Sequence, residues 1–111
     1  MKKMKILFVC LANVDRSPTA EEMFRSRPDL EVISAGISAV GGRQLTEELV
    51  KWADKIFVME QEQAEYIEAM VKGARSKTVV LDIPDIYPRN HPKLKMVIKD
   101  RVTPHLPNCC S

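Results

Sequence analysis

A cysteine and an arginine six positions apart could form a site for an oxyanion. They are Cys10 and Arg16, and Ser17 and Pro18 follow directly. A loop at the start of a helix turns unpaired backbone N–H groups and the positive end of the helix dipole toward an anion. Such surroundings also favour the thiolate form of a cysteine, which is the nucleophile. The pattern predicts an anion cradle with a nucleophile at one end and a guanidinium at the other.

The elements around this stretch are those that such a cradle requires. The apolar run at residues 6–9 predicts a buried strand, and apolar residues at helical spacing in 20–24 predict a helix. Pro18 suits the first turn of that helix, and Ser17 can cap it or donate to the sulfur. The bare spacing of cysteine and arginine is weak evidence, and its place between a strand and a helix strengthens it.

Three more apolar strands alternate with helices along the chain. The strands are expected at 30–34, 55–59 and 77–81, and the helices at 46–52, 61–72 and from 92 to 102. This alternation predicts an α/β fold with a parallel sheet, whose ligands bind beyond the carboxyl ends of the strands. We expect the side chains of Trp52 and Met96 to be part of the core. Gly73 is expected to end the helix at 61–72. The acidic run Glu60, Glu62, Glu65 and Glu68 is interpreted as a solvated face.

The loop after the fourth strand could supply an acid. It contains Asp82, Asp85 and Tyr87 between prolines. If Cys10 attacks phosphorus, a positioned acid protonates the leaving oxygen and then activates water as a base. An aspartate near phosphate and against prolines can stay protonated through desolvation and the charge of the anion. From the residues alone both Asp82 and Asp85 are candidates for this acid, and the competing interpretation is an ordinary turn capped by aspartate and stiffened by proline.

Several motifs resemble those of the low-molecular-weight protein tyrosine phosphatase family, which shares its fold and loop with thioredoxin-coupled arsenate reductases. The matching residues are Cys10, Asn13, Arg16, Ser17, Pro18, Glu21, the triplet Ser34-Ala35-Gly36, Ala53-Asp54 before a strand that ends at Met59, and Asp85 and Tyr87. The resemblance implies three layers, α/β/α, around a four-stranded parallel sheet of order 2-1-3-4. It also implies that the phosphate-binding loop follows the first strand.

The resemblance also implies a role for each of these site residues. Cys10 would be the nucleophile that forms a phosphocysteine, Arg16 a bidentate phosphate clamp, and Asp85 the general acid and base. Ser17 would donate to the thiolate, Asn13 would brace the loop, and Tyr87 would form a wall of the substrate cleft. The phosphate would be held by the loop residues Leu11, Ala12, Asn13, Val14, Asp15, Arg16 and Ser17, with Tyr87 nearby.

The chain departs from the family pattern at four places. Members are longer, and the shortening falls between Ser34 and Trp52. Ile86 replaces the proline of the family's Asp-Pro-Tyr, and Asp15 replaces a second loop cysteine. Ala12 replaces a glycine, which would strain the loop if its φ were positive.

Composition predicts one soluble domain over residues 1–111, with 104–111 as a C-terminal tail. The chain is 45% hydrophobic and 29% charged, with a net charge of +2. This charge is too mild, and aromatic residues are too few, to predict nucleic-acid binding. No apolar run approaches the roughly 20 residues of a membrane span. The basic start before residue 6 resembles a signal peptide but lacks a cleavage site, so we expect a cytoplasmic protein. We also expect it to be a monomer or a weak dimer.

The three cysteines leave a second hypothesis open. Cys10, Cys109 and Cys110 form no disulfide framework and no zinc spacing, and His91 and His105 add little, so we expect neither metal nor cofactor. Cys109 and Cys110 could be the resolving thiols of an arsenate reductase, although adjacent cysteines form an awkward disulfide. A phosphate- or phosphoprotein-binding module without turnover is the third hypothesis. The favoured one is a metal-independent phosphomonoesterase acting on a phosphotyrosine protein or a small phosphomonoester.

Overall fold

The computed structural model describes residues 3–13, 16–38, 42–84 and 86–106. The predictions made for Val14, Asp15, Asp85, Cys109 and Cys110 therefore lie outside the described residues.

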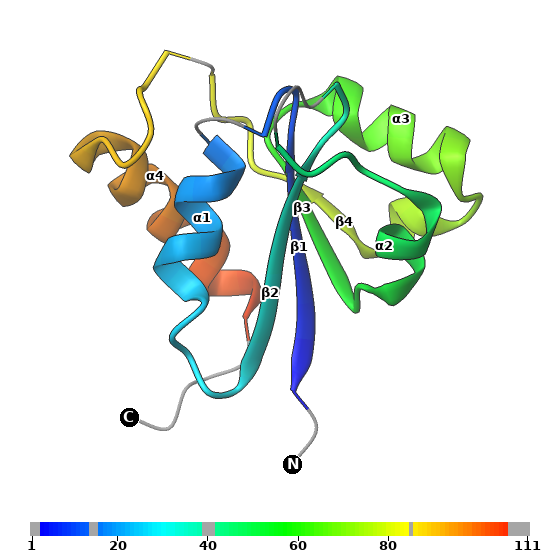
Figure 1. Ribbon diagram of the computed structural model, residues 1–111, viewed down its shortest axis with the longest axis horizontal. Helices are drawn as coiled ribbons and strands as arrows, with labels where there is room; N and C mark the ends of the chain where they lie inside the picture. Colours follow the sequence, from blue (N-terminus) through cyan, green and yellow to red (C-terminus); the bar gives the residue numbers. More distant parts are fainter. Residues whose placement is uncertain (1–2, 14–15, 39–41, 85, 107–111) are drawn as a thin grey trace.

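Four parallel strands form the middle layer (Figure 1). They are β1 (Met4–Cys10), β2 (Leu30–Gly36), β3 (Lys55–Val58) and β4 (Thr78–Val80). The sheet order is β2-β1-β3-β4, so β1 pairs with a neighbour on each side. The predicted α/β fold and strand order are both confirmed.

The helices cover both faces of this sheet, two on each side (Figure 1). The four helices are α1 (Arg16–Phe24), α2 (Glu47–Trp52), α3 (Gln61–Met70) and α4 (Pro92–Val102), with short 3₁₀ turns at Ala74–Lys77 and Thr103–His105. Helices α1 and α4 pack on one face, and α2 and α3 pack on the other. None of the helices in the described ranges is long and apolar enough to cross a membrane.

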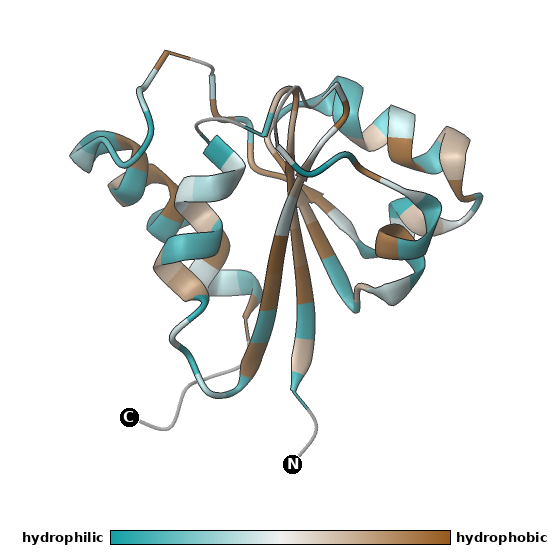
Figure 2. Ribbon diagram, in the orientation of Figure 1, coloured by the Kyte–Doolittle hydropathy of each residue, from teal (hydrophilic) through white to brown (hydrophobic). Residues whose placement is uncertain are grey.

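Strand β1 supplies both cores because its side chains alternate between the two faces. Residues 6–9 of this strand have no exposed surface, and Figure 2 shows the apolar colour running along the strands. Phe8 stacks on Phe24 of α1 and on Phe57 of β3, with ring centroids 5.9 and 5.4 Å apart. Cys10 belongs to the same core as Phe8, so the alternation turns the thiol toward the face covered by α1 and α4.

Three details of the predicted elements were wrong. Met96 is 65% exposed, because α4 buries Leu94, Ile98 and Val102, which share one face at a spacing of four residues. The helix predicted over 61–72 already ends at Met70. Gly73 has a φ of 92° and precedes the 3₁₀ turn rather than ending α3.

Trp52 was expected in the core and is half-buried there. Its side chain packs against the core on the α2 and α3 side, and Lys5 Nζ lies 5.9 Å from the centre of its ring.

Candidate functional site

The cradle lies at the carboxyl end of the central strand. Strand β1 ends at Cys10, and α1 begins at Arg16. Both side chains are almost completely buried, with 2% of each exposed. The strand, loop and helix predicted from the sequence are therefore all present, and both chemically important residues point inward.

The sulfur of Cys10 is surrounded by polar hydrogen-bond partners. Its Sγ lies 2.9 Å from the hydroxyl of Ser17, and the backbone N–H of Asn13 donates to it at 3.2 Å. The same hydroxyl donates to the carbonyl of Ala35 at 3.4 Å. The hydroxyl of Ser17 and the N–H of Asn13 are therefore both within hydrogen-bond distance of the sulfur of the proposed nucleophile.

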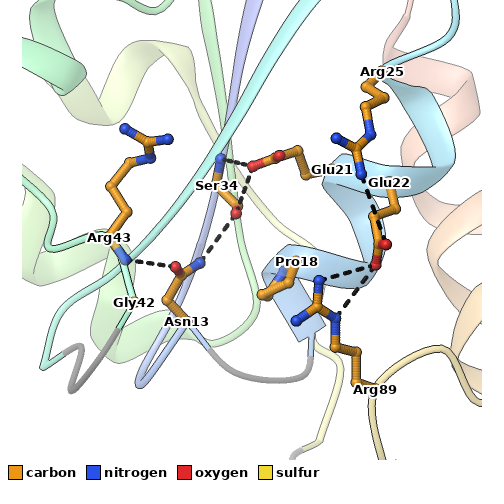
Figure 3. Close-up of a pocket in the computed structure, with 9 residues that line it drawn as sticks. All are labelled: Asn13, Pro18, Glu21, Glu22, Arg25, Ser34, Gly42, Arg43 and Arg89. Atoms are coloured by element: carbon orange, nitrogen blue, oxygen red, sulfur yellow. Dashed lines mark hydrogen bonds and ion pairs between the residues drawn. The ribbon is translucent and has the colours of Figure 1, made fainter.

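Asn13 joins three segments of the chain through its side chain, and Figure 3 shows its bonds to Ser34 and Arg43. Its Nδ2 donates to the hydroxyls of Ser17 at 3.0 Å and Ser34 at 3.1 Å, and its Oδ1 accepts from the backbone N–H of Arg43 at 2.8 Å. Its φ is 58°, a left-handed value that asparagine tolerates better than most residues. Ala12 does not have a positive φ, so the strain considered for it does not arise.

The start of α1 is tied to β2 by Glu21. Its Oε1 accepts from both the backbone N–H and the hydroxyl of Ser34, each at 2.8 Å (Figure 3). Gly36 lies directly against the backbone of the loop. A β-carbon added at this position would be 2.7 Å from the backbone nitrogen of Asn13. In the sequence these residues carry no signal beyond their likeness to a family, and the structure shows that Glu21, Ser34 and Gly36 all support the loop.

The guanidinium of Arg16 contacts two other elements. Its Nη1 donates to the carbonyl of Ile83 at 2.7 Å and lies 3.4 Å from Oε1 of Glu60. The amide of the buried Gln63 holds that carboxylate, because its Nε2 donates to Oε1 of Glu60 at 3.2 Å. The prediction of a solvated acidic face was therefore wrong for Glu60, whose partner lies far away in the sequence.

Glu68 also departs from that expectation. Its two carboxylate oxygens accept from the backbone N–H groups of Gly73 and Arg75, at 2.9 and 2.8 Å. These two hydrogen bonds lower the pKa of Glu68 below its ordinary value, and the bond from Gly73 has the larger effect. Glu62 and Glu65 are exposed, as predicted.

The loop after β4 approaches the cradle from its other side. Ile83 is fully buried, whereas Ile86 is 70% exposed. Asp82 is exposed with a φ of 58°, and Arg101 donates to its carbonyl. Tyr87 is half-buried, packs against the core, and has its ring centre 5.7 Å from that of His91.

A polar cavity of about 350 Å³ lies next to the hydrogen-bonded side chains of Asn13 and Ser34 (Figure 3). It is lined by Asn13, Pro18, Glu21, Glu22, Arg25, Ser34, Gly42, Arg43 and Arg89. Glu22 pairs there with Arg89 at 3.2 Å and with Arg25 at 3.7 Å. The hydrogen bond from Arg89 is the largest cause that lowers the pKa of Glu22. The sequence carried no signal for this cavity, since its walls come from four separate segments.

Within the described ranges, no group of three or more His, Cys, Asp or Glu side chains is placed to hold a metal ion. His91 instead caps α4, since its Nδ1 accepts from the backbone N–H of Lys93 at 3.1 Å. The ring of His105 meets the edge of Phe57.

Comparison with known proteins agrees with this geometry. The family model described as low molecular weight phosphotyrosine protein phosphatase matches residues 5–51. The low molecular weight protein-tyrosine-phosphatase Ptp of Acinetobacter johnsonii is 34% identical over 117 aligned positions, which cover 78% of this chain and 82% of that protein. Wzb of Escherichia coli K12 is 31% identical over 113 positions, covering 74% and 77%.

Solved structures show the same likeness. Vibrio vulnificus Wzb in complex with benzylphosphonate matches with a TM-score of 0.77 and 27% identity, over 93% of this chain and 97% of that one. The YwlE arginine phosphatase of Geobacillus stearothermophilus matches with a TM-score of 0.72 and 26% identity, over 92% of each. With its thiol, guanidinium and loop in this arrangement, the chain belongs to the low-molecular-weight protein-tyrosine-phosphatase family of cysteine-dependent phosphatases.

Proposed function

We propose that this protein hydrolyses phosphomonoesters in two steps through a phosphocysteine on Cys10. In the first step the thiolate attacks phosphorus, the S–P bond forms, and the P–O ester bond breaks. In the second step water attacks phosphorus, the S–P bond breaks, and inorganic phosphate leaves. The observation that carries this proposal is the sulfur of Cys10, which meets the hydroxyl of Ser17 at 2.9 Å and the N–H of Asn13 at 3.2 Å.

Arg16 and the loop amides are assigned to the phosphoryl oxygens. Fixed donors aimed at developing negative charge stabilise a transition state most where water is excluded. Arg16 is 2% exposed, so its guanidinium meets this condition. The amides of the loop from Leu11 to Ser17 complete the set in this proposal.

Asp85 is assigned the proton transfers. It would protonate the leaving oxygen in the first step and take a proton from water in the second. This assignment is supported by Ile83, two residues before Asp85, whose carbonyl accepts a hydrogen bond from Nη1 of Arg16 at 2.7 Å. The loop that contains the proposed acid is thus bonded to the residue that would clamp the phosphate.

Exposed apolar side chains favour an aromatic leaving group. Leu11 follows the nucleophile and is 50% exposed, and Ile86 follows Asp85 and is 70% exposed. Both belong to loops at the carboxyl edge of the sheet, where the ring of a phosphotyrosine would leave water. We therefore propose phosphotyrosine proteins or small aryl phosphates as substrates, and a phosphoarginine peptide serves as the comparison substrate.

The test is hydrolysis of para-nitrophenyl phosphate at mildly acid pH with EDTA present. We expect wild-type turnover, none in Cys10→Ser, and a fall of about 100-fold or more in Asp85→Ala. The double variant Cys109→Ser/Cys110→Ser is the matched thiol control and should retain full activity. Turnover that survives in Cys10→Ser would overturn the mechanism, and phosphate binding without any wild-type turnover would point to a binding module.

A further inference from the structure

The loop that contains Asp85 ends in a tight turn fastened to α1. The backbone N–H of His91 donates to the carbonyl of Pro88 at 3.1 Å, which closes the turn. Asn90, the third residue of the turn, has a φ of 63°, as this position requires in a type II turn. Its own N–H donates to Oγ1 of Thr19 at 2.9 Å. Thr19 has no exposed surface, so the bond enters the protein rather than the solvent.

Thr19 stands on the same helical turn as the groups that surround the nucleophile. Ser17, two residues earlier, places its hydroxyl 2.9 Å from the sulfur of Cys10. Arg16 donates to the carbonyl of Ile83 at the other end of the loop. The first turn of α1 therefore touches the nucleophile and both ends of the segment between Ile83 and Asn90.

An ion pair adds a second contact one turn further along α1. Nη2 of Arg89 lies 3.2 Å from Oε2 of Glu22 (Figure 3). The two side chains are 52% and 33% exposed, and exposed pairs of this kind contribute little. The hydrogen bond to the buried hydroxyl of Thr19 is therefore the stronger contact of this turn when it is compared with that ion pair.

We propose that Thr19 is a positioning residue for the proton transfers, because its hydroxyl holds the end of the loop that contains Asp85. This role rests on the proposed function. A displacement of about 1 Å in a reacting group can lower a rate by roughly 100-fold. Proton transfer to the leaving oxygen matters most when that oxygen leaves poorly, so the loss should depend on the substrate.

The test compares Thr19→Val, which keeps the shape and removes the hydroxyl, with Thr19→Ser, which keeps the hydroxyl. We expect Thr19→Val to lower kcat/KM, which reports the step that expels the leaving group, about 10-fold on phenyl phosphate, a poor leaving group, and about 3-fold or less on para-nitrophenyl phosphate. Inhibition by inorganic phosphate should stay within about 2-fold, because the substitution changes none of the groups assigned to the phosphoryl oxygens. Thr19→Ser should restore both rates.

Thr46→Val is the matched control. Thr46 also accepts a backbone N–H, that of Leu49 at 3.2 Å, but it caps α2 and lies outside the site, so kcat/KM should not change. If Thr19→Val does not fold, Thr19→Ala removes the same hydroxyl.

Equal kcat/KM values in wild type and Thr19→Val on both substrates would overturn the role of Thr19 alone. An equal loss on both substrates, together with weaker phosphate inhibition, would also overturn it, because that result reports damage to the cradle. Absence of hydrolysis by the wild type would overturn the proposed function and this role with it.

Discussion

The two ends of the phosphate-binding loop are held by different kinds of contact. Asn13 is fixed by uncharged groups, namely two serine hydroxyls and the backbone N–H of Arg43. Arg16 meets the carboxylate of Glu60 and the carbonyl of Ile83. A bound oxyanion can compete with Glu60 for the guanidinium, whereas nothing in a phosphate replaces the partners of Asn13. We therefore expect the Asn13 end to act as a scaffold and the Arg16 end to be the part that responds to a bound ligand.

The energies agree with this division. Each hydrogen bond of Asn13 contributes on the order of 1 kcal/mol, and leaving its buried partners unpaired costs more. Glu60 is 47% exposed, so its pair with Arg16 is expected to contribute about 0–1 kcal/mol. A contact of that size positions a side chain without fixing it against a ligand.

The largest expected effect comes from crowding the Asn13 end. In Gly36→Ala the new β-carbon would lie 2.7 Å from the nitrogen of Asn13 and 2.8 Å from the carbonyl carbon of Ala12, both backbone atoms. The loop must shift, so we expect kcat/KM to fall about 100-fold and stability by about 1–3 kcal/mol. Kinetics with para-nitrophenyl phosphate and urea unfolding measure the two losses.

Gly73→Ala is the control for this substitution. Gly73 has a φ of 92°, and a β-carbon there would meet nothing within 4 Å. We expect it to lose about 1 kcal/mol of stability from backbone strain and to retain full activity. Wild-type activity in Gly36→Ala would contradict the view of the Asn13 end as a rigid scaffold.

The next prediction concerns stability alone and removes the side chain of Asn13. Asn13→Ala loses three hydrogen bonds and must still adopt a φ of 58°, so we expect a loss of about 2–4 kcal/mol. Asn13→Gly loses the same bonds without the strain and should be about 1 kcal/mol more stable than the alanine variant. Urea unfolding of both variants separates the two causes. Equal stability would mean that the left-handed backbone costs nothing here.

The smallest effect tests a charged contact outside the loop. The hydrogen bond from Arg89 lowers the pKa of Glu22 from its ordinary 4.5, so ionised Glu22 stabilises the folded state above that pH. Glu22→Gln should therefore be less stable than wild type at pH 7. The difference should vanish as the pH falls through the lowered pKa and the carboxylate becomes protonated.

Melting temperatures at neutral pH and near pH 3 check this dependence on Glu22. The loss in Asn13→Ala should not follow the same curve, because its partners do not titrate in that range. A pH-independent difference for Glu22→Gln would show that its ion pair with Arg89 adds no stability.

Local patterns in the sequence predicted the frame of the site. The apolar run before Cys10 and the helix signals after Arg16 depend on nearest neighbours, and both elements are present. The alternation of strands and helices predicted the parallel sheet for the same reason.

The partners across the fold could not be predicted in this way. Glu60 and the exposed Glu62 are each followed by glutamine in the sequence. Glu60 lies beside Arg16 only because the chain just after β3 is close to the start of α1 in the fold. The bond between Asn13 and the backbone of Arg43 involves a group that every residue except proline carries, so no residue type could reveal it. Periodicity identifies the face that a residue occupies, and it does not identify the partner on that face.

The central place of β1 has a consequence for how the site is lost. Its residues pair with β2 and β3, and we expect the amides of a central strand of this kind to exchange with solvent mainly through global unfolding. Cys10, at the end of this strand, therefore belongs to the last cooperative unit to open. A core substitution that destabilises the whole fold would lower the fraction of active molecules and leave the turnover number of each folded molecule unchanged.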